Sequence, residues 1–190
     1  MIRTNYLIPA FFLLAAACTE DTPPRGEIEL NEAFSAEFDL IDMYGEPASD
    51  ERFEGKPMLI YFGFTSCPDV CPAALGVMTA TLDQLGRDAG DVQPLFITVD
   101  PERDTAERLR AHLSFDPRIL GLTGSEEELK DARNRMRVFA AKVPLKDSAV
   151  GYTVDHQSLF FLTDASGQPI VAFNDDMDPA VIAARIKARL

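Results

Sequence analysis

A chain of 190 residues has room for one domain of ordinary size, because single domains take about 100 to 200 residues. A hydrophobic content of 46% and a charged content of 26% are those of a globular protein and exclude both a polytopic membrane protein and a disordered polymer. The 31 acidic and 18 basic side chains give a formal net charge of -13, which argues against a nucleic-acid partner held through its phosphates.

The N-terminus has the pattern of an export signal. Arg3 is the one charged residue before Glu20, and an apolar run extends from Leu7 to Ala17. This run is shorter than the roughly 20 residues that span a bilayer and suits the core of a signal peptide. The small residues before Cys18 resemble the lipobox of bacterial lipoproteins, in which the cysteine carries lipid. We expect a signal peptide over residues 1–17, lipidation of Cys18 and anchoring at the periplasmic face of a bacterial membrane; cleavage without lipid and an uncleaved anchor are the alternatives.

Residues 18–33 are polar, acidic and proline-containing, so they predict a flexible tether ahead of a single domain over residues 34–190. Residues 58–64 form an unbroken apolar run with β-branched and aromatic side chains, which predicts a buried central strand. Apolar residues then recur at spacings of three and four from Leu75 to Leu85, which predicts a helix directly after that strand.

The rest of the chain continues the alternation of strands and helices. Strands are predicted over 95–99 and 119–122. One helix is predicted over 105–114, with Asp104 as its cap, and another from Ser125 to Phe139. A hairpin over 158–163 and 169–173 and a helix that begins at Asp178-Pro179 complete the chain. This order predicts an α/β fold, a thioredoxin-like mixed sheet flanked by helices, with a C-terminal hairpin and helix.

Cys67 and Cys71 lie in the turn between the first predicted strand and its helix. In an exported protein such a pair is one local disulfide, a redox pair or a soft-metal site. Unpaired N–H groups at a helix start favour the thiolate, which is both the nucleophile and the metal ligand. The four-residue spacing predicts that both side chains share one helical face, about 5–6 Å apart at Cβ, which allows a disulfide or the shared ligation of an ion.

The chain contains two histidines, and they differ in position. His112 falls in a predicted helix beside apolar residues, which favours a surface or half-packed side chain. His156 lies at the entry to the predicted hairpin, after a stretch with proline and lysine that is typical of a mobile loop. Position alone leaves two interpretations of His156, a ligand or a hydrogen-bonding residue at a strand end.

Three segments together resemble the signature of the Sco/SenC family, in the order that the family shows. They are YFGFTSCPDVCP over 61–72, VDPERDT over 99–105 and YTVDH over 152–156. The resemblance implies a thioredoxin-like domain tethered at a membrane, which binds one copper ion, Cu(I) or Cu(II), through Cys67, Cys71 and His156. The donor chemistry agrees, because thiolates select Cu(I) and imidazole also accepts Cu(II). Ser66 departs from the family pattern, in which a histidine often precedes the first cysteine.

The resemblance implies delivery of copper to the dinuclear site of cytochrome c oxidase subunit II, or to another copper-site protein, without turnover of a substrate. A thiol-disulfide oxidoreductase that reduces the cysteines of that partner is the alternative, and an inert disulfide is a third interpretation.

Three acidic residues are candidates for supporting roles. Asp69 could tune the cysteines or contact a partner, although an acidic residue also favours a helix start. Asp100 follows a central strand and should lie at the same end of the sheet as the cysteines, although a turn or capping role fits it equally. Asp155 could orient the neighbouring His156.

Overall fold

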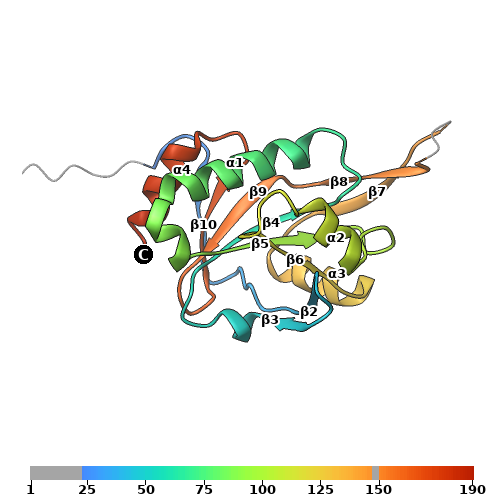
Figure 1. The fold of residues 1–190 in the computed structure, drawn as a ribbon, viewed down its shortest axis with the longest axis horizontal. Coiled ribbons are helices and arrows are strands. Elements are labelled where there is room, and N and C mark those ends of the chain that lie inside the picture. Colours follow the sequence, from blue (N-terminus) through green and yellow to red (C-terminus); the bar gives the residue numbers. More distant parts are fainter. Residues whose placement is uncertain (1–22, 147–149) are drawn as a thin grey trace, which may run out of the picture.

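The computed structural model describes residues 23–146 and 150–190. Its core is a mixed sheet of eight strands in the order β1-β10-β9-β4-β5-β6-β2-β3, with helices packed on it (Figure 1). The strands of this sheet are β1 (Glu27–Glu29), β2 (Asp39–Asp42), β3 (Pro47–Ser49), β4 (Met58–Gly63), β5 (Gln93–Thr98), β6 (Leu120–Thr123), β9 (Leu159–Thr163) and β10 (Pro169–Asn174). The helices are α1 (Val70–Leu85), α2 (Ala106–His112), α3 (Glu126–Arg135) and α4 (Pro179–Lys187), with short 3-10 helices η1 (Asp50–Phe53) and η2 (Gly86–Asp91). The predicted thioredoxin-like α/β fold is confirmed.

The centre of the sheet follows from the apolar runs. Every residue of β4 is buried, and the strand runs parallel to β5 on one side and antiparallel to β9 on the other. α1 turns its leucines and Met78 to the core and packs beside α4 (Figure 1). A buried strand that leads straight into an amphipathic helix places the intervening turn at the carboxyl edge of the sheet. The cysteines occupy that turn.

The predicted helix caps are largely as the sequence indicates. Ser125 and Glu128 form a complete capping box at the start of α3, and the Asp178 side chain accepts a hydrogen bond from the Ala180 N–H ahead of α4. Asp104 is the exception. The cap of α2 is Thr105, whose hydroxyl accepts from the Arg108 N–H at 3.2 Å, and Asp104 has a different role in the site.

The prediction of a tether over residues 18–33 is wrong for Glu27–Glu29, because these residues form β1 and pair with β10 at the edge of the sheet. The Glu27 side chain is fully buried between Arg185, at 2.7 Å, and Arg189, at 2.6 Å. An acidic segment enters the fold here because two arginines near the C-terminus, one in α4 and one just after it, neutralise the buried carboxylate. No apolar pattern in the sequence signals such a pairing. The predicted signal peptide and Cys18 lie outside the described residues.

Two further expectations fail after α3. The helix ends at Arg135, because Arg137 adopts a left-handed backbone with a φ of 54°, and Phe139 is exposed rather than helical. The segment expected to be a mobile loop contains a two-stranded ribbon of β7 (Ala140–Pro144) and β8 (Tyr152–His156). Figure 1 shows this ribbon extending away from the body of the fold. Val154 is the one buried residue among the ten of this ribbon, so the ribbon carries no strong apolar alternation.

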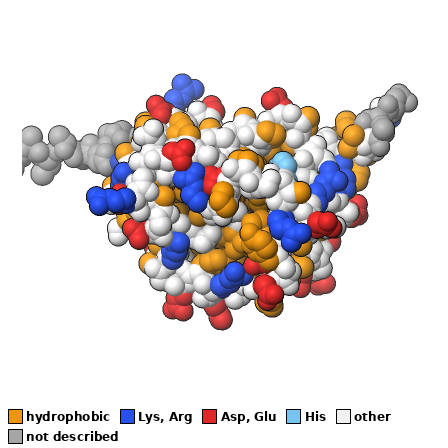
Figure 2. All heavy atoms as spheres, in the orientation of Figure 1, with side chains coloured by type: hydrophobic (Ala, Val, Ile, Leu, Met, Phe, Trp, Pro, Cys, Tyr) orange, Lys and Arg blue, Asp and Glu red, His pale blue; other side chains and the backbone are white. Residues whose placement is uncertain are grey.

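The acidic excess of the chain is not gathered into one area on the face drawn in Figure 2. Acidic and basic side chains are mixed there, and apolar side chains gather in its middle. Among the residues that the structure describes, no helix is both long and apolar enough to cross a lipid bilayer.

Candidate metal centre

The two cysteines meet at the start of α1. Cys71 lies in the first turn of the helix and is buried, whereas Cys67 lies in the preceding loop and is half-buried. The expected common helical face is therefore wrong, because Cys67 precedes the helix. The loop folds back instead, with the Cys67 N–H donating to the Phe64 carbonyl, and the Cys71 N–H points at Cys67 Sγ over 3.4 Å. An unpaired helix N–H thus meets a sulfur, as expected at a helix start.

His156 joins the cysteines from the end of β8. Its Nε2 lies 3.5 Å from Cys71 Sγ, although the two residues are 85 positions apart in the chain. Its Nδ1 lies 2.8 Å from the Gln157 carbonyl oxygen. Because a carbonyl only accepts, Nδ1 carries the proton of the neutral ring, and the lone pair of Nε2 faces the sulfur. The ring is enclosed edge-on by Tyr61 and Phe64, so it is held in the orientation that a ligand needs.

Burial decides the protonation of these donors. It raises the pKa of the Cys71 thiol to about 12, and the neighbouring Cys67 acts in the same direction, while the Phe64 backbone and the Tyr61 hydroxyl act against it. The expectation that the helix start favours a thiolate therefore fails at Cys71. Burial also lowers the pKa of His156, against the opposing effects of the Gln157 carbonyl and nearby carboxylates. At neutral pH the pair is a thiol and a neutral imidazole.

The three predicted donors form two pairwise contacts and not a finished cluster. Within the described part of the chain, no three His, Cys, Asp or Glu side chains stand together as a metal site. Cys71 contacts His156 through its side chain, and it contacts Cys67 through both its backbone N–H and its thiol.

The three acidic candidates differ in burial and in the groups that they contact. Asp69 is exposed at the N-cap position of α1 and makes no capping hydrogen bond with its side chain. Asp155 is exposed on β8, and the Nδ1 partner of His156 is the Gln157 carbonyl rather than this carboxylate. Asp100 is buried at the end of β5 and pairs with Arg103 and Tyr152.

Asp104 holds the cysteine loop and does not cap α2, so the prediction of a helix cap at this residue is wrong. It is fully buried, and its carboxylate accepts hydrogen bonds from the Thr65 N–H at 2.9 Å, the Thr65 hydroxyl at 2.6 Å and the Thr98 hydroxyl at 2.7 Å. It thereby ties the loop that leads to Cys67 to the end of β5. Its signal in the sequence is a second aspartate in the same turn as Asp100.

Tyr61 was expected only as a buried strand residue. Its hydroxyl lies 2.9 Å from the Ser158 hydroxyl, which donates to Asp175 at 2.5 Å. Burial, followed by the proximity of Cys71, raises the Tyr61 pKa, so the hydroxyl keeps its proton. A tyrosine in an otherwise apolar central strand needs a partner for its hydroxyl, and this requirement is the signal that could have found the chain of contacts.

The comparisons with known proteins cover most of the chain. The family model described as SCO1/SenC matches residues 26–190. The chain belongs to the SCO1/SenC family. A SCO2-like protein of Rickettsia conorii is 39% identical over 176 residues, which cover 90% of this chain and 86% of that protein. The structure of Bradyrhizobium japonicum ScoI with copper bound is 41% identical, with a TM-score of 0.76 over 83% of this chain and 99% of that chain. BsSco, described as a member of the Sco family of cytochrome c oxidase assembly proteins with a disulfide switch, is 25% identical, with a TM-score of 0.67 over 85% of this chain and 95% of that chain.

In this SCO1/SenC chain, Ser66 stands directly before the first motif cysteine. Arg108 of α2 donates to the Ser66 hydroxyl at 2.9 Å and to the Thr65 hydroxyl at 2.8 Å. The loop is therefore fixed from outside by Arg108 and from inside by Asp104. His112 takes no part, since it is half-buried against Phe96 and its Nε2 has no hydrogen-bond partner among the described residues.

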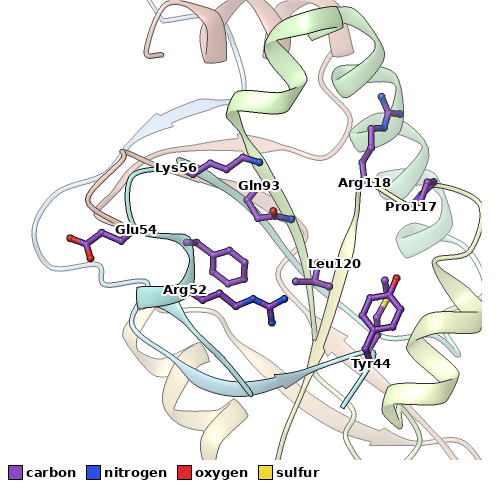
Figure 3. Close-up of a pocket in the computed structure, with 10 residues that line it drawn as sticks. Tyr44, Arg52, Glu54, Lys56, Gln93, Pro117, Arg118 and Leu120 are labelled. Atoms are coloured by element: carbon purple, nitrogen blue, oxygen red, sulfur yellow. The ribbon is translucent and has the colours of Figure 1, made fainter. Parts of the chain in front are cut away.

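A hollow of about 500 Å³ lies at the opposite edge of the sheet, where β5 and β6 begin. In Figure 3, Arg52 and Lys56 reach toward it from one side, and Leu120 forms part of its floor. No cysteine or histidine lines it, and Arg52 already pairs with the buried Asp42. The chemistry that distinguishes this SCO1/SenC protein therefore lies at the cysteine edge.

Proposed function

We propose that the protein is an exported, membrane-tethered copper chaperone that binds one copper ion with Cys67, Cys71 and His156 and delivers it to the dinuclear copper site of cytochrome c oxidase subunit II. The observation that carries the proposal is the 3.5 Å contact between Cys71 Sγ and His156 Nε2, with Cys67 Sγ held at the Cys71 N–H. Membership of the SCO1/SenC family and the copper-bound ScoI relative support it.

The donor set suits copper for chemical reasons. Two sulfur ligands select Cu(I), and a neutral imidazole also accommodates Cu(II), so one site serves both states. A structural zinc site would normally take four protein ligands, and this constellation offers three. A metal that binds Cys71 must displace the thiol proton that burial retains, so loading is coupled to proton release.

Access and anchoring complete the proposal. Cys67 is half-buried and so reachable by a partner, while Cys71 is buried. Such an arrangement suits transfer of the ion from the inner donors through the outer sulfur to the thiolates of the receiving protein. Lipid on Cys18 would hold the domain at the periplasmic side of the membrane, and mass spectrometry of the membrane-extracted protein tests that step.

Copper titration of the reduced protein tests the binding function. We expect one equivalent of Cu(I) per chain and a large loss of affinity in the His156→Ala variant. His112→Ala serves as the matched control, because His112 lies outside the site, and it should bind like the wild type. An unchanged affinity in His156→Ala would remove this histidine from the ligand set.

A second candidate function is reduction of the partner's cysteines, favoured by the free, half-buried Cys67 beside a helix N–H. The Cys67 thiolate would attack a disulfide of the partner, releasing one partner thiolate and forming a mixed disulfide. Cys71 would then displace the second partner thiolate, leaving the partner reduced and the pair oxidised. Cys71→Ser should trap the mixed disulfide if this reaction occurs. Absence of a trapped partner, with copper binding intact in the wild type, would leave the chaperone as the better function.

A further inference from the structure

We propose that Arg103 and Tyr152 are positioning residues that hold His156 against the cysteines and so set the copper affinity of the site. This inference rests on the proposed copper-binding function. Both residues belong to signature segments of the sequence, yet neither is a metal donor in the proposed ligand set. Their contacts explain what the two segments do together.

The first observation is how little else holds the ribbon that carries His156. β8 has hydrogen-bonded strand pairing with β7 alone, and the two form a sheet separate from the main one (Figure 1). An isolated two-stranded ribbon is marginally stable in water. Along β8, alternate residues share a face, so Tyr152, Val154 and His156 point the same way. Val154 is buried, which identifies this face as the one turned to the body of the protein.

The second observation is the density of contacts at Tyr152. The Arg103 guanidinium lies 4.0 Å from the centre of the Tyr152 ring, and its Nη1 donates to the Tyr152 carbonyl at 3.0 Å. The Tyr152 hydroxyl donates to the buried Asp100 at 2.7 Å and lies 3.1 Å from Glu102. Burial and these carboxylates raise the Tyr152 pKa, so the hydroxyl keeps the proton that it donates. The loop after β5 therefore holds the ring, the hydroxyl and the backbone of Tyr152.

The third observation links the same loop to the other half of the site. Arg103 pairs with Asp100, and it also faces the Phe64 ring. That ring makes an edge-to-face contact with His156. Four residues after Asp100, Asp104 holds Thr65 in the loop that leads to Cys67. The segment from Asp100 to Asp104 therefore binds the cysteine loop at one end and the histidine ribbon at the other. One rigid segment sets the separation between the sulfur and imidazole donors.

A purely structural role would make a different prediction from a positioning role. If Arg103 and Tyr152 only stabilise the fold, their loss should weaken copper binding equally whether or not His156 is present. If they act through His156, their loss should weaken copper binding in the protein that retains His156 but not in the His156→Ala background. A double-mutant cycle separates these cases.

The experiment measures Cu(I) affinity by competition with a chromogenic chelator, using the full reduced protein. The variants are Tyr152→Ala, Tyr152→Phe and Arg103→Lys, each also in the His156→Ala background. We expect Tyr152→Ala to weaken binding about tenfold, in the range known for groups that orient metal ligands. Tyr152→Phe keeps the ring under the guanidinium and should lose less. In the His156→Ala background none of them should weaken binding further.

Two control variants match the substitutions. Tyr44→Ala removes a tyrosine that is 59% exposed near the β2–β3 turn, and Arg110→Lys changes an exposed arginine of α2. Neither should alter copper affinity. The Cu(II) absorption spectrum gives a second readout, and Tyr152→Ala should shift it toward that of His156→Ala. If Arg103→Lys fails to fold, Tyr152→Ala alone decides the cycle.

The outcomes separate the inference from the function beneath it. If His156→Ala weakens binding and Tyr152→Ala does not, the positioning role is refuted while the copper site stands. An equal loss in both backgrounds also refutes it. If His156→Ala itself binds Cu(I) like the wild type, the proposed ligand set fails, and the positioning role fails with it.

Discussion

Asp104 offers the sharpest test of how the cysteine loop is held. The carboxylate is fully buried, and its Oδ2 accepts from both the Thr65 N–H and the Thr98 hydroxyl, while Oδ1 accepts from the Thr65 hydroxyl. We expect that removing it destabilises the protein and loosens the loop that carries Cys67. Asp104→Ala and Asp104→Asn separate the two oxygens, because asparagine retains one acceptor.

The magnitude follows from the donors left behind. A buried donor without a partner costs about 1–3 kcal/mol. In Asp104→Ala the Thr65 N–H and the Thr98 hydroxyl both lose their acceptor, whereas the half-buried Thr65 hydroxyl still accepts from Arg108. We therefore expect a loss of about 3 kcal/mol for Asp104→Ala. In Asp104→Asn the amide oxygen can occupy the Oδ2 position and keep both of those bonds, so we expect about 1 kcal/mol.

Urea unfolding followed by circular dichroism measures these free energies. Asp131→Ala is the matched control, because Asp131 is exposed and pairs only with Arg135 on the same helix, and it should stay within about 0.5 kcal/mol of the wild type. Folded Asp104→Asn should also bind Cu(I) more weakly than the wild type. A loss below about 1 kcal/mol in Asp104→Ala would show that the buried carboxylate does not anchor the loop.

Three further predictions concern the edge strand, the acid side of stability and metal loading. Glu27→Ala leaves two C-terminal arginines without their buried partner, so urea unfolding should show a loss of about 3 kcal/mol in the free energy of unfolding. A loss near zero would show that β1 does not contribute to the stable fold. Burial alone would raise the pKa of Asp42, but hydrogen bonds from Arg52 and from backbone N–H groups outweigh it and hold the pKa below 3.8. The resulting stabilisation is present above about pH 4 and disappears as the pH falls through the lowered pKa. Arg52→Met should therefore make the free energy of unfolding depend less on pH in this acid range. An unchanged pH dependence would contradict the role of Arg52 in lowering the Asp42 pKa. Because the Cys71 pKa is raised to about 12, Cu(I) binding to this residue at neutral pH must release the thiol proton. Calorimetry in buffers of different ionisation enthalpy should detect the released proton. Binding without proton release would show that Cys71 is not a ligand.

The local patterns of the chain were sufficient for its central elements. An apolar run too short for a helix predicted β4, the spacing of apolar residues after it predicted α1, and Ser125 with Glu128 predicted the start of α3. Each of these signals acts over a few residues, because pairing, helical periodicity and capping depend on neighbours in the chain. The resemblance of three short segments to one family likewise pointed to Cys67, Cys71 and His156. The structure brings the Cys71 side chain into contact with each of the other two.

Tertiary structure decided what depends on distant partners. The high pKa of Cys71 arises from burial under strands and loops far along the chain, so the helix start alone predicted the wrong protonation state. Glu27 enters the sheet only because Arg185 and Arg189 neutralise it from the other end of the chain. The roles of Asp100 and Asp104 depend on the groups that face them, Tyr152 and Thr65, which lie 52 and 39 positions away. Sequence patterns determine which residues are buried, but the charge and hydrogen bonds of a buried polar group are set by whichever distant residues fold against it.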